Sequence, residues 1–197
     1  HFFKNIFGGM AGGFSQGTGF NYPPQRGENL EAEVELSIKE VYTGATKLIQ
    51  VNGDKIEVRF KPGIKDGQTL KISGKGNPGA HGGNRGDLLI KVKVADNPRI
   101  TRKDDDLHVE VTIDLFKAIM GGSTTISSFG GRIKIEIPPE SQPGKVLKLK
   151  GQGMPNYNNQ EQKGDLYIKL QVKLPTNLSE KEKELFKELE QLRKNKS

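Results

Sequence analysis

The stretch Val34-Glu35-Leu36-Ser37-Ile38 decides the fold, because a second version, Val111-Thr112-Ile113-Asp114-Leu115, follows 77 residues later. The same spacing carries Ile56–Phe60 onto Ile133–Ile137. An internal repeat has to be identified before any other feature, since it determines the architecture. A repeat of about 80 residues is the size of one small domain. The chain is therefore predicted to hold two similar β-domains in tandem.

The repeat extends beyond these strands into the glycine-rich segments. The further matching pairs are Gly44 with Gly121, Leu70–Ile72 with Leu147–Leu149, Gly74 with Gly151, Gly76 with Gly153 and, after a slip of one residue, Gly86-Asp87-Leu88 with Gly164-Asp165-Leu166. Loops and strands thus repeat together, which indicates two whole domains rather than a recurring short motif.

Period-two alternation predicts the strands of both copies. Apolar and polar residues alternate from Leu30 to Ile38. The first copy is predicted to have a strand there, a helical turn ending at Gly44, and strands at 47–51, 56–60, 69–73 and 88–94. The second copy is predicted to have strands at 107–115, 123–127, 132–137, 146–150 and 166–174, with a helical turn at 116–120. The fold class is mainly β, with two tandem sandwich- or barrel-like domains, short helices and a C-terminal helix.

Composition changes mark the boundaries of four regions. Five of the nine phenylalanines lie in the first 20 residues, interleaved with glycines that make ordering costly. We expect a Gly/Phe-rich tether at 1–27, a first β-domain at 28–105, a second at 106–175 and a helix within 176–197. The tether is either a linker with incidental aromatics, or its phenylalanines compete for an apolar groove on the next domain.

The last region has the pattern of an amphipathic helix. Ser179 with Glu182 forms a capping-box signature at its start. Leu185, Leu189 and Leu192 recur at helical spacing, with Phe186 beside them. A single apolar stripe of this kind needs the second domain or a second chain to pack against.

Composition excludes several functional classes. The absence of cysteine excludes disulfides, thiol catalysis and cysteine-ligated zinc. No apolar run is long enough to span a membrane, so no membrane partner is expected. The net charge of +7 favours acidic partners. Lysines that keep a β-rich protein in solution and protect its edge strands explain this charge more simply than a nucleic-acid surface.

The chain holds few candidates for catalysis. Its histidines, His1, His81 and His108, are scattered, and the one carboxylate cluster, Asp104-Asp105-Asp106, falls at the junction between the copies. The glycines around Lys75 do not precede a helix, which argues against a phosphate-binding loop. We predict no enzymatic activity, no metal and no cofactor.

The repeated motif resembles the substrate-binding C-terminal domains of the DnaJ family. The resemblance rests on the strand–PxG–turn–strand–GxG pattern from Phe60 to Gly76, which recurs from Ile137 to Gly153 with Glu140 in place of Gly63. It extends through Gly86-Asp87-Leu88 and through the segment Pro98 to Leu107, which is similar to the family's FxRxxxDL element. The tether and the terminal helix also stand where the family has them.

Two departures refine the resemblance. The cysteine-rich zinc insert of the first DnaJ class is absent, because Val51 is followed after four residues by Ile56. The chain therefore resembles the second class, similar to bacterial curved-DNA-binding proteins. The His-Pro-Asp-bearing J-domain is also absent, and we expect the chain to be a fragment that starts after it and does not stimulate a chaperone ATPase alone.

The resemblance implies a co-chaperone that holds unfolded or extended polypeptides for delivery to a DnaK-type chaperone in the cytoplasm. It implies a client groove between the two sheets of the first domain, lined by Ala32, Val34, Ile49, Val51 and Ile90. It further implies that Lys47, at the rim, binds the acidic tail of the DnaK-type partner, and that Leu185, Phe186 and Leu189 form a homodimer. Alternation along the strands places Ala32 and Val34 on one face, and Ile49 and Val51 on one face. It does not tell whether these side chains line a groove or belong to the core.

A DNA-binding protein is the alternative from a different class. The net charge and the curved-DNA-binding relatives motivate non-specific DNA binding. Salt dependence separates the two hypotheses, because DNA binding weakens steeply with ionic strength.

Overall fold

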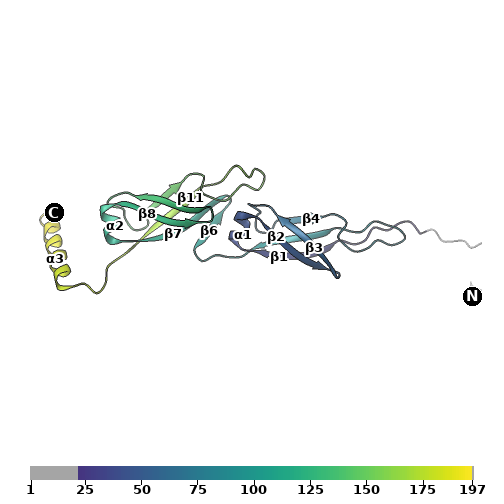
Figure 1. The fold of residues 1–197 in the computed structure, drawn as a ribbon, viewed down its shortest axis with the longest axis horizontal. Helices are drawn as coiled ribbons and strands as arrows, with labels where there is room; N and C mark the ends of the chain where they lie inside the picture. The colour runs from purple at the N-terminus through teal and green to yellow at the C-terminus, as the bar shows by residue number, and fades with distance from the viewer. Residues whose placement is uncertain (1–21, 197) are drawn as a thin grey trace, which may run out of the picture. The chain divides into compact units, whose positions relative to one another are not determined.

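The computed structural model describes residues 22–196, which form a mainly β protein (Figure 1). The described chain divides into two compact units, one of residues 22–31 with 71–89 and the other of residues 32–70 with 90–196. The strand positions predicted from alternation agree closely with the observed elements, and the mainly β fold class is confirmed.

The first copy of the repeat contains five strands and one short helix. In chain order these are β1 (Leu30–Leu36), α1 (Ile38–Thr43), β2 (Ala45–Val51), β3 (Asp54–Phe60), β4 (Thr69–Ile72) and β5 (Leu88–Val94). The helix α1 begins at a capping box that the sequence analysis did not identify. The Ser37 hydroxyl accepts from the Glu40 backbone N–H, and the Glu40 carboxylate accepts from the Ser37 N–H.

The second copy repeats this order and adds one strand before it. Its elements are β6 (Ile100–Lys103), β7 (Asp106–Asp114), α2 (Leu115–Met120), β8 (Gly122–Ser128), β9 (Gly131–Ile137), β10 (Val146–Leu149) and β11 (Leu166–Lys173). The strand β6 was not predicted. It has four residues and is formed by antiparallel pairing with β7, from Ile100 opposite Val109 to Lys103 opposite Asp106.

The sheet order confirms the repeat. The larger sheets run β1-β5-β4 in the first copy and β10-β11-β7-β6 in the second, so β4, β5 and β1 correspond to β10, β11 and β7. The two-stranded sheets, β2-β3 and β8-β9, have the same antiparallel register, because Ala45 opposite Phe60 becomes Gly122 opposite Ile137. The strands β7 and β11 are parallel neighbours.

Alternate residues of the central strands form the core. Leu88, Ile90 and Val92 of β5 are fully buried, as are Ile168 and Leu170 of β11. Asp87 and Ser141 are the buried polar residues among those that the structure describes. The Gly-Asp-Leu segments therefore lead directly into the strands, β5 and β11, whose side chains form the core.

The C-terminal helix α3 (Glu180–Lys194) begins where the capping box predicted. The Ser179 hydroxyl accepts from the Glu182 N–H at 3.1 Å, and the Glu182 carboxylate accepts from the Ser179 N–H at 2.6 Å. None of the residues of α3 is buried. The helix therefore forms from its own capping and propensity, and its apolar stripe stays on the surface.

Other expectations fall outside what the structure tests. The phenylalanines of the tether precede the described residues, and the four domain boundaries remain predictions.

No helix in the described range is long and apolar enough to cross a membrane. Within residues 22–196, histidine and carboxylate side chains form no group of three that could hold a metal ion.

Candidate functional site

Four of the five predicted groove residues lie partly exposed on two strands. Ala32 and Val34 are half-buried on one face of β1, and Ile49 and Val51 are half-buried on one face of β2. The next residue in the β1 alternation, Leu36, is fully buried. The apolar face of β1 therefore emerges from the core toward its N-terminal end, where side chains remain accessible to a ligand.

The fifth predicted residue, Ile90, has no exposed surface. It lies in β5 as part of the core, where it can support neighbouring side chains but presents no surface to a peptide. Leu48, between Lys47 and Ile49 on β2, points to the opposite face and is 70% exposed. It gives a natural control for substitutions at Ile49.

Lys47 lies on the same face of β2 as Ile49 and is already paired. Its ammonium lies 2.6 Å from the Glu40 carboxylate of α1, and both side chains are about one-third exposed. Lys47, followed by the Ser37 backbone N–H, lowers the pKa of Glu40 to about 2. An acidic ligand at Lys47 would therefore have to share this ammonium with Glu40 or displace it.

The second copy presents a cavity at the corresponding place. Val109, Val111 and Ile126 stand 77 residues after Ala32, Val34 and Ile49, and all three line a largely apolar cavity of about 310 Å³. Leu107, Leu166 and Ile100 add to its apolar lining, while Tyr42 of α1 and Phe129 of the β8–β9 turn stand at its side. The sequence analysis missed this site, although the repeat spacing alone could have located it.

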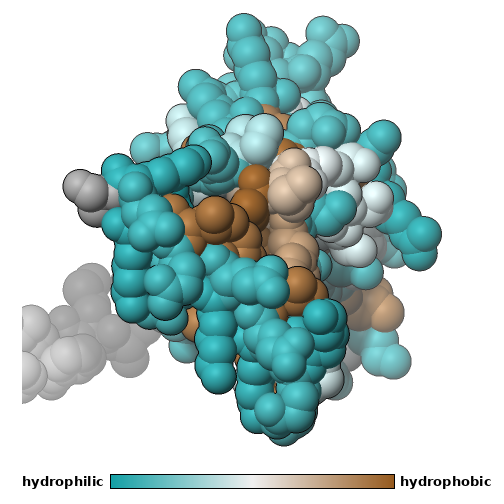
Figure 2. All heavy atoms as spheres, turned by 90° about the vertical axis from the view of Figure 1, so that its left-hand side faces the viewer, coloured by the Kyte–Doolittle hydropathy of each residue, from teal (hydrophilic) through white to brown (hydrophobic). Residues whose placement is uncertain are grey.

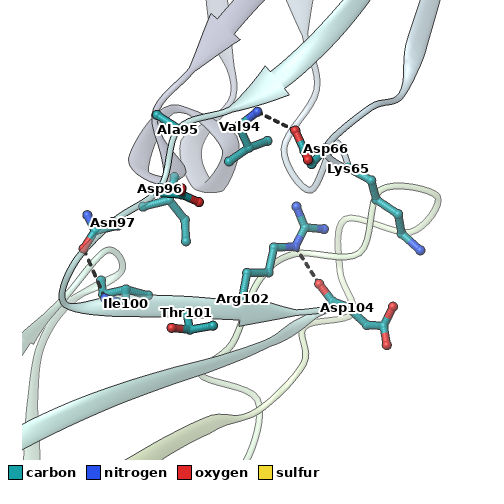
Figure 3. Close-up of a pocket in the computed structure, with 11 residues that line it drawn as sticks. Lys65, Asp66, Val94, Ala95, Asp96, Asn97, Ile100, Thr101, Arg102 and Asp104 are labelled. Carbon is teal, nitrogen blue, oxygen red and sulfur yellow. Dashed lines mark hydrogen bonds between the residues drawn. The ribbon is translucent and has the colours of Figure 1, made fainter.

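A second, more polar pocket lies where the two copies join (Figure 3). Arg102 points into it from β6, and its guanidinium donates to the backbone carbonyls of Asp104, Gly63 and Ile64, the last at 2.6 Å. Nearby, the Val94 N–H donates to the Asp66 carboxylate at 2.8 Å. These groups are used by internal hydrogen bonds, which indicates a structural junction.

The Gly-Asp-Leu and GxG motifs are explained by one aspartate carboxylate in each copy. Asp87 accepts from the Gly74 N–H at 3.0 Å and pairs with Lys71, also at 3.0 Å. In the second copy Asp165 accepts from Gly151 at 2.9 Å and pairs with Lys148 at 3.2 Å. In each copy the aspartate at the end of the glycine-rich loop accepts a hydrogen bond from the glycine at its start, which holds the two ends of the loop together. These motifs therefore maintain the fold rather than bind phosphate.

The two carboxylates differ in their surroundings. The Asp87 side chain is 4% exposed and has an additional ion pair with Arg26 at 2.8 Å, whereas the Asp165 side chain is 23% exposed. The Gly74 N–H, followed by Lys71, lowers the pKa of Asp87 to about 2. The Gly151 N–H and Lys148 lower the pKa of Asp165 as well.

Apolar side chains also gather at the C-terminal end of the chain. Figure 2 shows a hydrophobic area in the middle of this face, bordered by hydrophilic surface. Leu185, Leu189 and Leu192 of α3 are 46–60% exposed, and Phe186 is half-buried. These residues line a groove together with Phe116 of α2, itself 57% exposed. The predicted dimerisation residues are thus accessible on one surface.

The fold and these surfaces first define a class, a tandem-repeat β protein with partly exposed aliphatic faces next to short helices. The comparisons with known proteins then identify the family. Residues 30–175 match the family described as DnaJ C terminal domain, and the chain belongs to this family. The family is one of chaperones and not of enzymes, in agreement with the resemblance seen in the sequence.

Individual relatives extend the match along the chain. It is 33% identical over 193 residues to "Chaperone protein DnaJ" of Deinococcus proteolyticus, which covers 97% of this chain and 58% of the relative. It is 30% identical over 189 residues to "Chaperone protein DnaJ 2" of Thermus thermophilus, covering 95% and 63%. The chain thus spans about three-fifths of the length of these relatives.

Proposed function

We propose that this chain binds unfolded or extended hydrophobic polypeptide segments and presents them to a DnaK-type chaperone in the cytoplasm. The observation that carries the proposal is the pair of matching apolar faces. Ala32, Val34, Ile49 and Val51 remain half-exposed in the first copy, and the equivalents of the first three line a cavity in the second. Aliphatic side chains left accessible at equivalent positions of two copies suit recognition of apolar segments.

Strand geometry supports the way in which a peptide would bind. The strand β2 has only β3 as a neighbour in its two-stranded sheet, so one edge of its backbone is open within the described chain. An extended peptide can add a strand to such an edge and place alternate side chains against the apolar face. This mode requires no particular sequence in the client.

The expected affinity is modest. Three aliphatic side chains buried by a client contribute roughly 5–8 kcal/mol before costs. Ordering the peptide and losing its overall freedom offset much of this, which leaves dissociation constants on the order of micromolar or weaker. Weak binding allows release, and two chains acting together would raise the apparent affinity.

The proposal includes two protein partners. Lys47 is proposed to receive the acidic tail of the DnaK-type chaperone, in competition with Glu40 at 2.6 Å. A second copy of the chain is proposed to cover Leu185, Phe186 and Leu189, because these side chains line an open groove together with Phe116 of α2. Sedimentation of the chain with and without residues 179–197 tests the dimer, and an unchanged mass on truncation would contradict it.

Charged substitutions on the apolar face test client binding. Val34→Asp and Ile49→Asp should strongly reduce suppression of a model client's aggregation and leave only what the second copy provides, because a carboxylate cannot be desolvated against an apolar segment. Leu48→Asp is the matched control, since Leu48 is exposed on the opposite face of the same strand. Full suppression by a folded Ile49→Asp variant would refute the first-domain groove.

Salt dependence tests the alternative of non-specific DNA binding. Client capture through apolar contacts should change little between low and physiological salt, whereas DNA binding should weaken steeply. Retention on DNA at physiological salt, without suppression of client aggregation, would favour the alternative.

A further inference from the structure

The turn between β8 and β9 contains a residue that turn geometry does not explain. In the first copy the corresponding turn is Asn52-Gly53, with φ values of 49° and 87°. Positive φ at both central residues is typical of the type I′ turn that suits a two-residue hairpin, and Asn-Gly is its preferred sequence. The second copy has Phe129-Gly130 instead, with positive φ at neither residue. The backbone of this turn therefore does not call for asparagine, and the surroundings of Phe129 become informative.

Phe129 contacts Tyr42 of α1. The two rings lie 5.4 Å apart between centroids with a 43° tilt, a favourable arrangement for an aromatic pair. The Lys163 ammonium donates to the Tyr42 hydroxyl at 3.1 Å and lies 5.3 Å from its ring centroid. A Cβ placed on Gly130 would lie 2.8 Å from the Tyr42 hydroxyl, so the turn passes close to the tyrosine. Tyr42 is therefore held from two sides.

Both rings belong to the wall of the second-copy cavity. Its aliphatic lining comes from β6, β7, β8 and β11. Its polar lining includes Arg99 and Glu110, which have opposite charges, together with Ser127, Ser128 and Gln152. The strand β8 pairs only with β9 in its sheet, so one backbone edge is open among the described strands. The site thus combines an apolar cavity, one residue of each charge in its lining, and a β8 backbone edge that can pair with an extended chain.

We propose that Tyr42 and Phe129 form an aromatic jaw that makes the second-copy cavity select an aromatic side chain of an extended client segment. The inference rests on the proposed function and specifies the ligand of one of its sites. The first copy has Ala32, Val34 and Ile49 at the positions of Val109, Val111 and Ile126, and Asn52 at the position of Phe129. The two copies would therefore divide client recognition between aliphatic and aromatic side chains.

The chemistry of the wall favours this occupant over others. An inserted ring can pack edge-to-face or offset on two rings, which is worth a few-fold in affinity beyond the area buried. The polar lining has no net charge from Arg99 and Glu110, so it does not favour a charged ligand. A cavity of about 310 Å³ is at the small end of ligand pockets, which suits a side chain better than a whole cofactor.

The test uses two fluorescent peptides that differ only in a central Phe or Leu, with uncharged flanks. Their dissociation constants are measured by anisotropy with the 197-residue chain carrying Ile49→Asp, which removes the first-copy face. This protein should bind the Phe peptide roughly three- to tenfold more tightly than the Leu peptide. Adding Phe129→Asn, the residue that the first copy has at this turn, should reduce the preference to less than about twofold.

The outcomes separate the jaw from the wider function. Equal binding of both peptides to the Ile49→Asp chain, or a preference that survives Phe129→Asn, would overturn the jaw and leave client binding standing. Failure of the unaltered chain to bind either peptide would overturn the proposed function and the jaw with it. Tyr42→Leu tests the other ring of the pair, and a folded Tyr42→Leu protein that keeps the preference would also refute the jaw. Circular dichroism establishes that each variant is folded.

Discussion

The first and second copies of the repeat share the register of their two-stranded sheets, yet they differ where one touches the other. Gly63 and Glu140 occupy equivalent turns, and both have left-handed backbones, with φ of 82° and 59°. A Cβ at Gly63 would overlap the carbonyl oxygen of Pro155. The carbonyls of Gly63 and Ile64 also accept from Arg102. Glycine is thus required in the first copy by its neighbours, whereas the second copy tolerates a glutamate.

The same comparison applies to the surfaces proposed to bind ligands. At the positions of Glu40 and Lys47, which form an ion pair, the second copy has Lys117 and Thr124. At the position of Asn52 it has Phe129, which packs on Tyr42. Duplication preserved the strands and their hydrogen bonds, while exposed positions on the same framework diverged. Three experiments examine this difference, in order of decreasing effect.

The largest effect on the free energy of unfolding is expected from substitutions at the two turn residues. Gly63→Ala should lower the free energy of unfolding by roughly 2–4 kcal/mol, because a left-handed alanine costs about 1–2 kcal/mol and the Pro155 backbone must also move. Glu140→Gly should change it by less than about 1 kcal/mol, because relief of strain and added chain entropy oppose each other. Urea unfolding of both variants measures the difference, and equal effects would contradict the role of the Pro155 contact.

An intermediate effect is expected from acid. The folded-state pKa of Asp87 is lowered to about 2 from an ordinary 3.8, so its contribution to stability is complete above the ordinary value and is lost as the pH falls toward 2. Asp165 lacks a partner equivalent to Arg26 and should take up its proton at a higher pH than Asp87. Carboxyl ¹³C NMR titration measures both pKa values.

Asp87→Asn supplies the control for the acid experiment. The variant should lose the part of the pH dependence of unfolding that falls between about pH 2 and 4. An Asp87 that titrates at its ordinary pKa, or above Asp165, would show that the buried hydrogen bond from Gly74 is not maintained.

The smallest effect on stability is expected from Lys47→Thr, which installs the second-copy residue. Its ion pair with Glu40 is partly exposed, so its loss should cost under about 1 kcal/mol. The substitution should weaken binding of an acidic peptide that ends in a free carboxylate. Calorimetry at low salt, where charge attraction is least screened, measures this loss. Lys91→Thr, at an exposed lysine of β5, controls for the change in net charge. Equal weakening by both variants would remove Lys47 as a specific site.

Much of the fold was predictable because it depends on local patterns. Alternation located β5 to the residue, and the capping residues located the start of α3. The strand β6 was missed because four residues carry too little periodicity, and pairing with β7 creates it. At the site, strand parity placed Val34 and Ile49 on apolar faces, but could not distinguish them from Ile90, which is fully buried.

The amino-acid sequence by itself determined the repeat, the strands and the family, because these depend on spacing between neighbours along the chain. It also contained the equivalence between Ile49 and Ile126. Only the tertiary structure decided which apolar residues stay accessible, that Glu40 neutralises Lys47, and that Tyr42 meets Phe129. Tyr42 and Phe129 are far apart in the chain, and Glu40 and Lys47 lie on different elements, so the geometry of both contacts follows from packing rather than from any local pattern.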